Sequence, residues 1–123
     1  MNFELSEEQK MIQQSVERFV QENYDLPKRV EISSKDPGYS KDYWNSMAEL
    51  GWLGLPFSEK DGGFGGNQID TLVIMEQFGK GLVLEPFLAN IVLGGGAIQM
   101  GGSEELKNEM LSSLIEGSKQ LTL

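Results

Sequence analysis

The chain has 123 residues, no cysteine, no histidine and a formal net charge of −9 at pH 7. Without cysteine these residues form no disulfide bond and no thiolate, and without histidine they lack the commonest general base and metal ligand near neutral pH. A catalytic or metal-binding role for them is therefore disfavoured, and the acidic balance also disfavours nucleic acid and anionic membrane surfaces as partners.

Hydropathy and the N-terminal residues indicate whether the protein is soluble and in which compartment it is expected. No apolar run approaches the ~20 residues that a membrane-spanning helix needs, and the opening MNFELSEEQK is acidic where a signal peptide is basic. Hydrophobic residues make up 39% of the chain, which is too high for a disordered tail. We expect a soluble, cytoplasmic protein with no membrane partner.

The first predicted helix runs from Ser6 to about Asn23. Ser6 and Gln9 have the spacing of a capping box, in which each side chain bonds the backbone amide of the other residue. An apolar stripe recurs at helical spacing at Ile12, Val16, Phe19 and Val20. Residues 25–39 contain two prolines, several charges and a glycine, so they predict a loop or a broken short helix.

A second helix is predicted from its cap at Ser40 to about Leu50, where Gly51 is a natural left-handed stop. The apolar connector at 52–57 then leads into a glycine-rich loop at 58–67.

A third helix is predicted to start at Gln68 or Asp70 and to run to Gly79. Because its sequence is apolar on most sides, we expect this helix to be central.

Two more helices follow, one from about Pro86 to Met100 and one that is capped by Ser103 and ended by Gly117. The last residues, 119–123, read KQLTL and look like a strand just beginning. The predicted fold class is therefore all-α, a five-helix bundle with a strand beginning at its C-terminal end.

The stretch DGGFGG at 61–66 raises the question of whether it binds phosphate. A dinucleotide fingerprint requires a third glycine where Gln68 stands, and a P-loop requires Lys and Ser or Thr where Asn67 and Gln68 follow. We therefore predict a tight turn between two helices, in which glycine allows positive φ and close backbone approach. Its lead-in at 52–57 is expected to pack the domain.

Three segments together carry a more specific pattern: AELGWLGLPFSEKDGGFGG, QIDTLVIMEQFGKGLVLEPF and GGSEELKNEMLSSLIEGSKQLTL. Over nearly the whole chain they resemble the N-terminal helical domain of the flavin-dependent acyl-CoA dehydrogenases, which typically show a Gly-Trp loop ending in paired glycines and a helix that leads into a strand. LPFSEKDGGFGG followed by FGKGLVLEPFLANIVLGGGAI resembles, more narrowly, the small subunit of the pimeloyl-CoA dehydrogenases.

The resemblance implies a parent enzyme of three parts, in which residues 1–118 are the helical domain and residues 119–123 begin a β-domain. FAD would be held by the parts that are not present here, and a carboxylate there would remove the α-proton of an acyl-CoA. Electrons would pass to an electron-transferring flavoprotein, and the enzyme would be a homo- or hetero-oligomer. No catalytic or cofactor-binding residue is carried over, so we expect the 123-residue chain alone to be inactive and to bind no FAD tightly.

The resemblance also implies that the helix near Pro86 helps to wall the acyl pocket. Glu85, Ala89 and Leu93 share a helical face at i, i+4 and i+8, with Pro86 beside them, and these four are the candidate pocket residues. The alternative is that Ala89 and Leu93 are ordinary core and Glu85 is a solvated carboxylate at the helix start. Glu85 has the wrong sign to bind the distal carboxylate of a pimeloyl group.

Three consecutive glycines, Gly94, Gly95 and Gly96, lie in the same predicted helix. Each costs about 1 kcal/mol relative to alanine, so three together need a structural reason. Their missing side chains leave room either for an acyl tail or for a closely packed neighbouring helix, unless the glycines mark a break in the helix.

Two other classes of function compete with the interpretation as a domain of an enzyme. One is a stand-alone helical interaction module, and the other is a non-catalytic partner chain of a heteromeric dehydrogenase.

Overall fold

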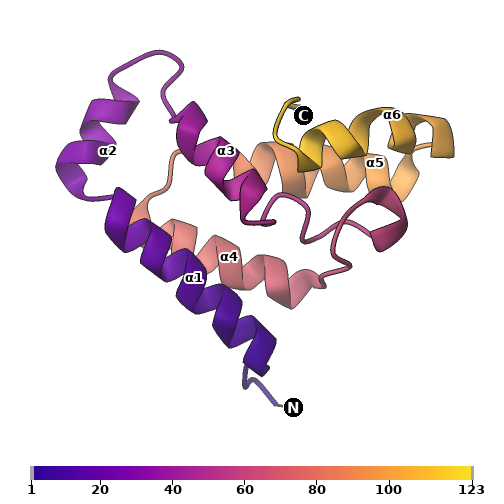
Figure 1. The fold of residues 1–123 in the computed structure, drawn as a ribbon, viewed down its shortest axis with the longest axis horizontal. Coiled ribbons are helices and arrows are strands. Elements are labelled where there is room, and N and C mark those ends of the chain that lie inside the picture. Colours follow the sequence, from indigo (N-terminus) through magenta and orange to yellow (C-terminus); the bar gives the residue numbers. More distant parts are fainter. Residues whose placement is uncertain (1, 123) are drawn as a thin grey trace. The chain divides into compact units, whose positions relative to one another are not determined.

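The computed structural model describes residues 2–122, and over that range it contains helices and no strand (Figure 1). The elements in chain order are α1 (Glu7–Asn23), α2 (Leu26–Ser33), α3 (Lys41–Glu49), the 3₁₀ turn η1 (Glu59–Asp61), α4 (Gln68–Gly81), the π-helix η2 (Leu88–Gly95), α5 (Gly96–Gly101) and α6 (Glu104–Ile115). The all-α prediction is confirmed, although the elements are more numerous than the five helices expected.

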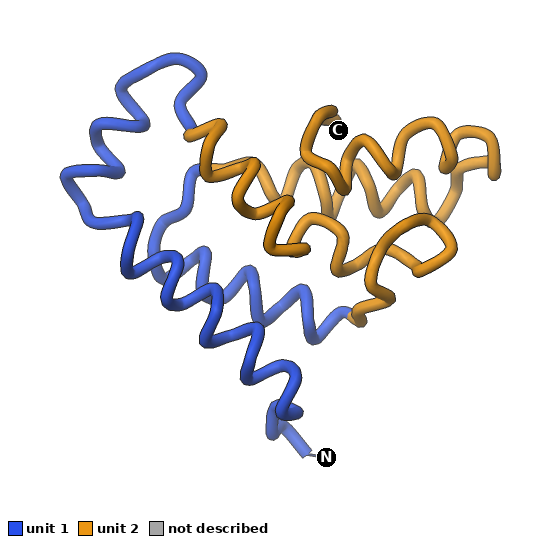
Figure 2. The backbone as a smooth tube through the Cα atoms, in the orientation of Figure 1, with its two compact units in different colours: residues 1–39, 68–84 blue, residues 40–67, 85–123 orange. Residues whose placement is uncertain are grey.

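The chain divides into two compact units (Figure 2). Unit 1 comprises Met1–Tyr39 and Gln68–Leu84, and unit 2 comprises Ser40–Asn67 and Glu85–Leu123. Each unit is therefore built from two stretches of chain that are far apart in sequence. The predicted boundary after residue 118 concerns a different division and stays a prediction.

In unit 1, α1 and α4 pack side by side (Figure 1). The predicted capping box is present, because the Gln9 amide donates to Ser6 Oγ at 3.1 Å and the Ser6 amide donates to Gln9 Oε1 at 3.0 Å. The Gln9 side chain also donates to Asp70 Oδ1 of α4, at 2.9 Å. Buried apolar side chains of this unit include Val16, Val20, Val73, Ile74 and Phe78.

The helix α4 is not buried on all sides, which corrects the expectation that it is central. Ile69 is 47% exposed and Leu72 is 59% exposed, so α4 buries one face only. An apolar sequence does not by itself show that every face is covered, since much of the surface of a folded protein is apolar.

The helix α2 is the short-helix alternative that was left open for residues 25–39. Asp25 caps it, with Oδ1 accepting from the Lys28 amide at 2.7 Å, and Pro27 lies in the first turn, where its missing N–H breaks no helical bond. No residue of α2 is buried. Arg29 joins it to the rest of unit 1 by donating from Nε to the Leu82 carbonyl at 2.8 Å.

In unit 2, the predicted caps and stops are confirmed. Ser40 Oγ accepts from the Tyr43 amide and Ser103 Oγ from the Leu106 amide, both at 3.2 Å. Gly51 and Gly117 have positive φ, 83° and 77°. The core of this unit includes the following side chains: Trp44, Met47, Trp52, Leu53, Phe57, Phe87, Ile91, Leu111 and Leu114.

The strand predicted at 119–123 is not formed among the described residues, and Leu123 itself lies outside them. A strand is defined by hydrogen bonds to a partner strand. Here the Leu121 amide donates to the side-chain oxygen of Asn90 instead.

Candidate functional site

The candidate pocket residues belong to a segment that is not a regular α-helix. The single helix predicted from Pro86 to Met100 is a π-helix, η2, followed by the short helix α5. A π-helix has i→i+5 hydrogen bonds and occurs frequently at functional sites. Because its turn is wider, the i, i+4, i+8 spacing no longer establishes that Glu85, Ala89 and Leu93 share one face.

Glu85 is 5% exposed, so the alternative of a solvated carboxylate is wrong for this residue. Its Oε2 accepts a hydrogen bond from the Ser40 amide at 3.2 Å, which links the segment that precedes η2 to the N-cap of α3. Pro86 and Ala89 are half-buried, and Leu93 is 46% exposed. Leu93 is therefore not ordinary core, and its apolar surface is available within this unit.

The three glycines have different surroundings. A Cβ on Gly94 would lie 2.9 Å from Leu121 Cβ, and a Cβ on Gly95 would lie 2.4 Å from Phe57 Cζ. A Cβ on Gly96 would meet nothing within 4 Å. Gly94 and Gly95 thus permit close packing, as one hypothesis held, but the neighbours are the C-terminal segment and the 52–57 connector rather than another helix.

Asn90 is a residue that the sequence patterns did not single out. It is 2% exposed, its Oδ1 accepts from the Leu121 amide, and its Nδ2 donates to the Pro86 carbonyl at 3.2 Å. An asparagine inside the apolar run FLANIVL is a signal that could have found it, because a buried amide side chain requires partners.

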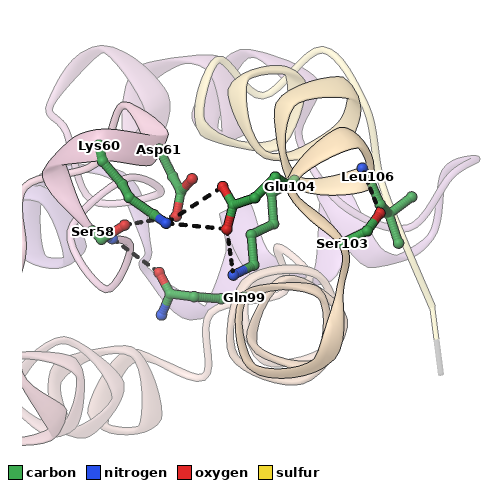
Figure 3. A network of polar contacts seen from close by, with 8 residues as sticks. Ser58, Lys60, Asp61, Gln99, Ser103, Glu104 and Leu106 are labelled. Carbon is green, nitrogen blue, oxygen red and sulfur yellow. Dashed lines mark hydrogen bonds and ion pairs between the residues drawn. The ribbon is translucent and has the colours of Figure 1, made fainter.

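The glycine-rich loop of unit 2 is held by a polar network (Figure 3). The Ser58 amide donates to Gln99 Oε1 at 2.9 Å, and Ser58 Oγ donates to Asp61 Oδ2 at 2.6 Å, so Asp61 closes its own turn. Lys60 Nζ lies 3.2 Å from Glu104 Oε1, across to the first turn of α6. The polar groups of this network bond to one another, which is typical of a turn whose role is structural.

The loop amides point inward to backbone carbonyls. Gly63 donates to Ser58 O at 3.0 Å, Gly65 to Phe57 O at 2.8 Å, and Gly66 to Leu55 O at 2.7 Å. An anion cradle needs unpaired N–H groups, so this part of the loop does not fit the phosphates of a nucleotide or flavin cofactor. The close approach predicted for its glycines is confirmed, since a Cβ on Gly63 would lie 2.3 Å from Phe57 O.

Other candidate features carry less chemistry. A hollow of about 340 Å³ lies between α3 and the end of α6 and is lined by Asn45, Ala48, Glu49 and Glu116. Within residues 2–122 no group of His, Cys, Asp or Glu has the arrangement of a metal site. The same described part of the chain has no helix long and apolar enough to cross a bilayer.

Comparison with known proteins gives a consistent result. The family model for the acyl-CoA dehydrogenase N-terminal domain matches residues 6–118. A probable acyl-CoA dehydrogenase of Bacillus subtilis is 32% identical over 120 residues, which cover 96% of this chain and 31% of the relative. The short-chain specific acyl-CoA dehydrogenase of Clostridium acetobutylicum is 31% identical over 97% of this chain and 31% of its own length.

Among solved structures, butyryl-CoA dehydrogenase from Megasphaera elsdenii matches with a TM-score of 0.82 and 25% identity, over 98% of this chain and 32% of that one. A chain of the ChsE4–ChsE5 complex from Mycobacterium tuberculosis matches over 99% of this chain and 34% of that one, with a TM-score of 0.91 and 24% identity, which shows the fold. The chain thus spans about a third of the length of the relatives it matches.

Proposed function

Because the chain belongs to the acyl-CoA dehydrogenase family through its N-terminal domain, we propose that it is the helical part of an enzyme that introduces an α,β double bond into acyl-CoA thioesters. The observation that carries this proposal is the family match over residues 6–118, supported by the TM-score of 0.82 to a butyryl-CoA dehydrogenase. The chain's share in that enzyme is to pack the domain, to take part in an oligomer and to help wall the acyl pocket.

The proposed cofactor of the complete enzyme is FAD. A solved structure titled as PigA with FAD and proline matches with 30% identity and a TM-score of 0.78. The paired amides of the glycine loop do not fit the cofactor's phosphates, so we assign FAD binding and the catalytic carboxylate to residues outside this chain. The flavin would accept the hydride from the substrate.

The proposed electron acceptor is an electron-transferring flavoprotein. A solved structure described as the electron-transferring flavoprotein of Acidaminococcus fermentans matches this chain with 26% identity and a TM-score of 0.80. A cytoplasmic location is proposed together with it, on the strength of the acidic, cysteine-free composition.

The candidate pocket wall is Glu85, Pro86, Ala89 and Leu93. The exposed apolar surface of Leu93 and the half-buried Ala89 support a wall for an aliphatic tail. Pimeloyl-CoA is the finer proposal, and the sequence resemblance alone supports it. Glu85 is negatively charged when ionised and gives no cation for the distal carboxylate.

The test is acyl-CoA-dependent bleaching of the flavin in the complete chain purified from its native cells. Bleaching with straight-chain acyl-CoA supports the proposal, and a flavin-free native protein of 13.7 kDa contradicts it and leaves the interaction module. Activity only in the presence of a second, different subunit would identify a partner chain of a heteromeric enzyme. A lower KM for heptanoyl-CoA than for pimeloyl-CoA would contradict the finer proposal.

A further inference from the structure

The C-terminal segment 118–122 meets η2 at two residues, Asn90 and Gly94, which we call the tail seat. Asn90 Oδ1 accepts from the Leu121 amide, and the missing side chain of Gly94 leaves the space in which the Leu121 side chain lies. A Cβ added at Gly94 would come within 2.9 Å of Leu121 Cβ and 3.1 Å of the Ala89 carbonyl oxygen. The seat thus holds one backbone group and one apolar side chain of an extended segment.

The chemistry of Asn90 is specific for this contact. Burying an amide side chain without hydrogen bonds is unfavourable, and Asn90 is 2% exposed. Its Nδ2 is used within its own turn, on the Pro86 carbonyl, whereas its Oδ1 reaches the tail across a sequence separation of 31 residues. Replacing this side chain by an apolar one of similar size would leave the Leu121 amide without that acceptor.

The rest of the segment is attached to a different element. The Ser118 and Lys119 amides both donate to the Ser113 carbonyl, at 3.0 and 3.2 Å, so this part of the tail follows the end of α6. Leu121 attaches the tail to η2. The tail seat therefore ties residues 118–122 to the segment that bears Ala89 and Leu93.

We propose that Asn90 and Gly94 are positioning residues, which fix segment 118–122 against η2 and so set where the acyl-chain wall stands relative to the part of the enzyme that follows. This inference rests on the proposed function. Asn90 follows the wall residue Ala89 in the sequence, and Gly94 follows the wall residue Leu93. A change in how the tail contacts Asn90 and Gly94 would therefore also shift these two wall residues. A misplacement of about 1 Å is sufficient to impair substrate binding or turnover.

The experiment uses the complete chain and compares Gly94→Ala with Gly96→Ala as a matched control. Both substitutions add one methyl group to the same glycine run, but only the first meets Leu121. Asn90→Leu removes the acceptor, and Leu121→Gly tests the seat from the tail side should Asn90→Leu fail to fold. In all three seat variants, we expect hydrogen exchange of the peptide that covers residues 118–122 to be roughly tenfold faster than in the control.

The second readout is steady-state kinetics together with flavin content. We expect the seat variants to raise KM for acyl-CoA by roughly three- to tenfold, with kcat and flavin content close to those of Gly96→Ala. A purely structural defect would lower flavin content and kcat together, and that result would overturn the positioning role.

Three outcomes distinguish the failures. Unchanged exchange in every seat variant would overturn the seat itself. Faster exchange with the KM of the control would overturn its positioning role. A wild-type chain with no acyl-CoA-dependent bleaching would overturn the proposed function and the positioning role with it, whereas the exchange comparison would still decide whether the seat holds the tail.

Discussion

At the residue scale, Glu85 combines burial with a defined hydrogen-bond partner, the Ser40 amide at the N-cap of α3. We expect Glu85→Leu to lower the free energy of unfolding by about 1–3 kcal/mol, because it leaves the part-buried Ser40 N–H without this acceptor. Glu85→Gln keeps a side-chain oxygen of the same reach and should cost less. Urea unfolding of the purified protein measures both. Equal losses in the two variants would contradict this account, since they would point to the charge rather than the hydrogen bond.

At the element scale, the glycine loop is stabilised by backbone packing that tolerates no side chain at Gly63. We expect Gly63→Ala to destabilise the protein by about 1–3 kcal/mol, because its Cβ would overlap the Phe57 and Gly54 carbonyl oxygens. Gly79→Ala in α4 is the control, since a Cβ there meets nothing within 4 Å and alanine favours the helix by up to about 1 kcal/mol. Thermal unfolding compares the two. A Gly63→Ala variant as stable as the control would refute the packing argument.

No residue of the helix α2 is buried, so the interactions between its charged side chains lie at the surface and can be followed by titration. Hydrogen bonds from Lys35 and then Lys28 hold the pKa of the exposed Glu31 carboxyl below its ordinary value of 4.5. Because the pKa of Glu31 is lower in the folded than in the unfolded protein, its ionised carboxyl stabilises the folded state at pH values above the unfolded-state pKa. This stabilisation is lost as the pH falls through the folded-state pKa. Carbon-detected NMR titration should show a Glu31 midpoint below 4.5 that rises towards it in Lys35→Gln or at high salt. A midpoint that is insensitive to both changes would contradict the assigned cause.

Local signals predicted the elements well, and long-range contacts account for what they missed. The Ser6–Gln9 box, the Ser40 and Ser103 caps and the Gly51 and Gly117 stops are read from a few neighbouring residues, and the structure confirms them.

The Asn90–Leu121 contact joins residues that are 31 positions apart in the sequence, and no local period encodes it. The π-helical turn departs from the period of about 3.6 residues on which the helix prediction rested. For the same reason, the helical spacing of Glu85, Ala89 and Leu93 did not reveal which of them are buried. The buried Glu85 carboxylate accepts a hydrogen bond from the Ser40 amide, which lies 45 residues away in the sequence.

At the scale of the whole molecule, each of the two compact units combines an earlier and a later stretch of the chain. Each unit is completed by a later stretch of the chain, Gln68–Leu84 for unit 1 and Glu85–Leu123 for unit 2. Neither unit is a continuous segment, so a cut at residue 67 would separate α1 from α4 and α3 from α6. We conclude that the fold of either unit requires the chain up to its later stretch.

The exposed apolar surface of unit 2 predicts how the 123-residue chain behaves alone. Leu88 is 49% exposed, Leu93 46% and Met100 90%, and surfaces of this kind favour association. The net charge of −9 opposes association by mutual repulsion, but the repulsion is screened within about 8 Å at physiological ionic strength, whereas apolar burial is not screened.

We therefore expect the weight-average mass in sedimentation equilibrium to rise above 13.7 kDa with protein concentration, and to rise further as salt is added. Leu93→Lys should weaken this association, because it places a charge in the apolar surface, and Ala97→Lys, also at an exposed position of the same segment, tests whether any added cation has the same effect. A chain that stays at 13.7 kDa at every concentration and salt would favour a stand-alone module, since a module of that kind has no covering partner to lose.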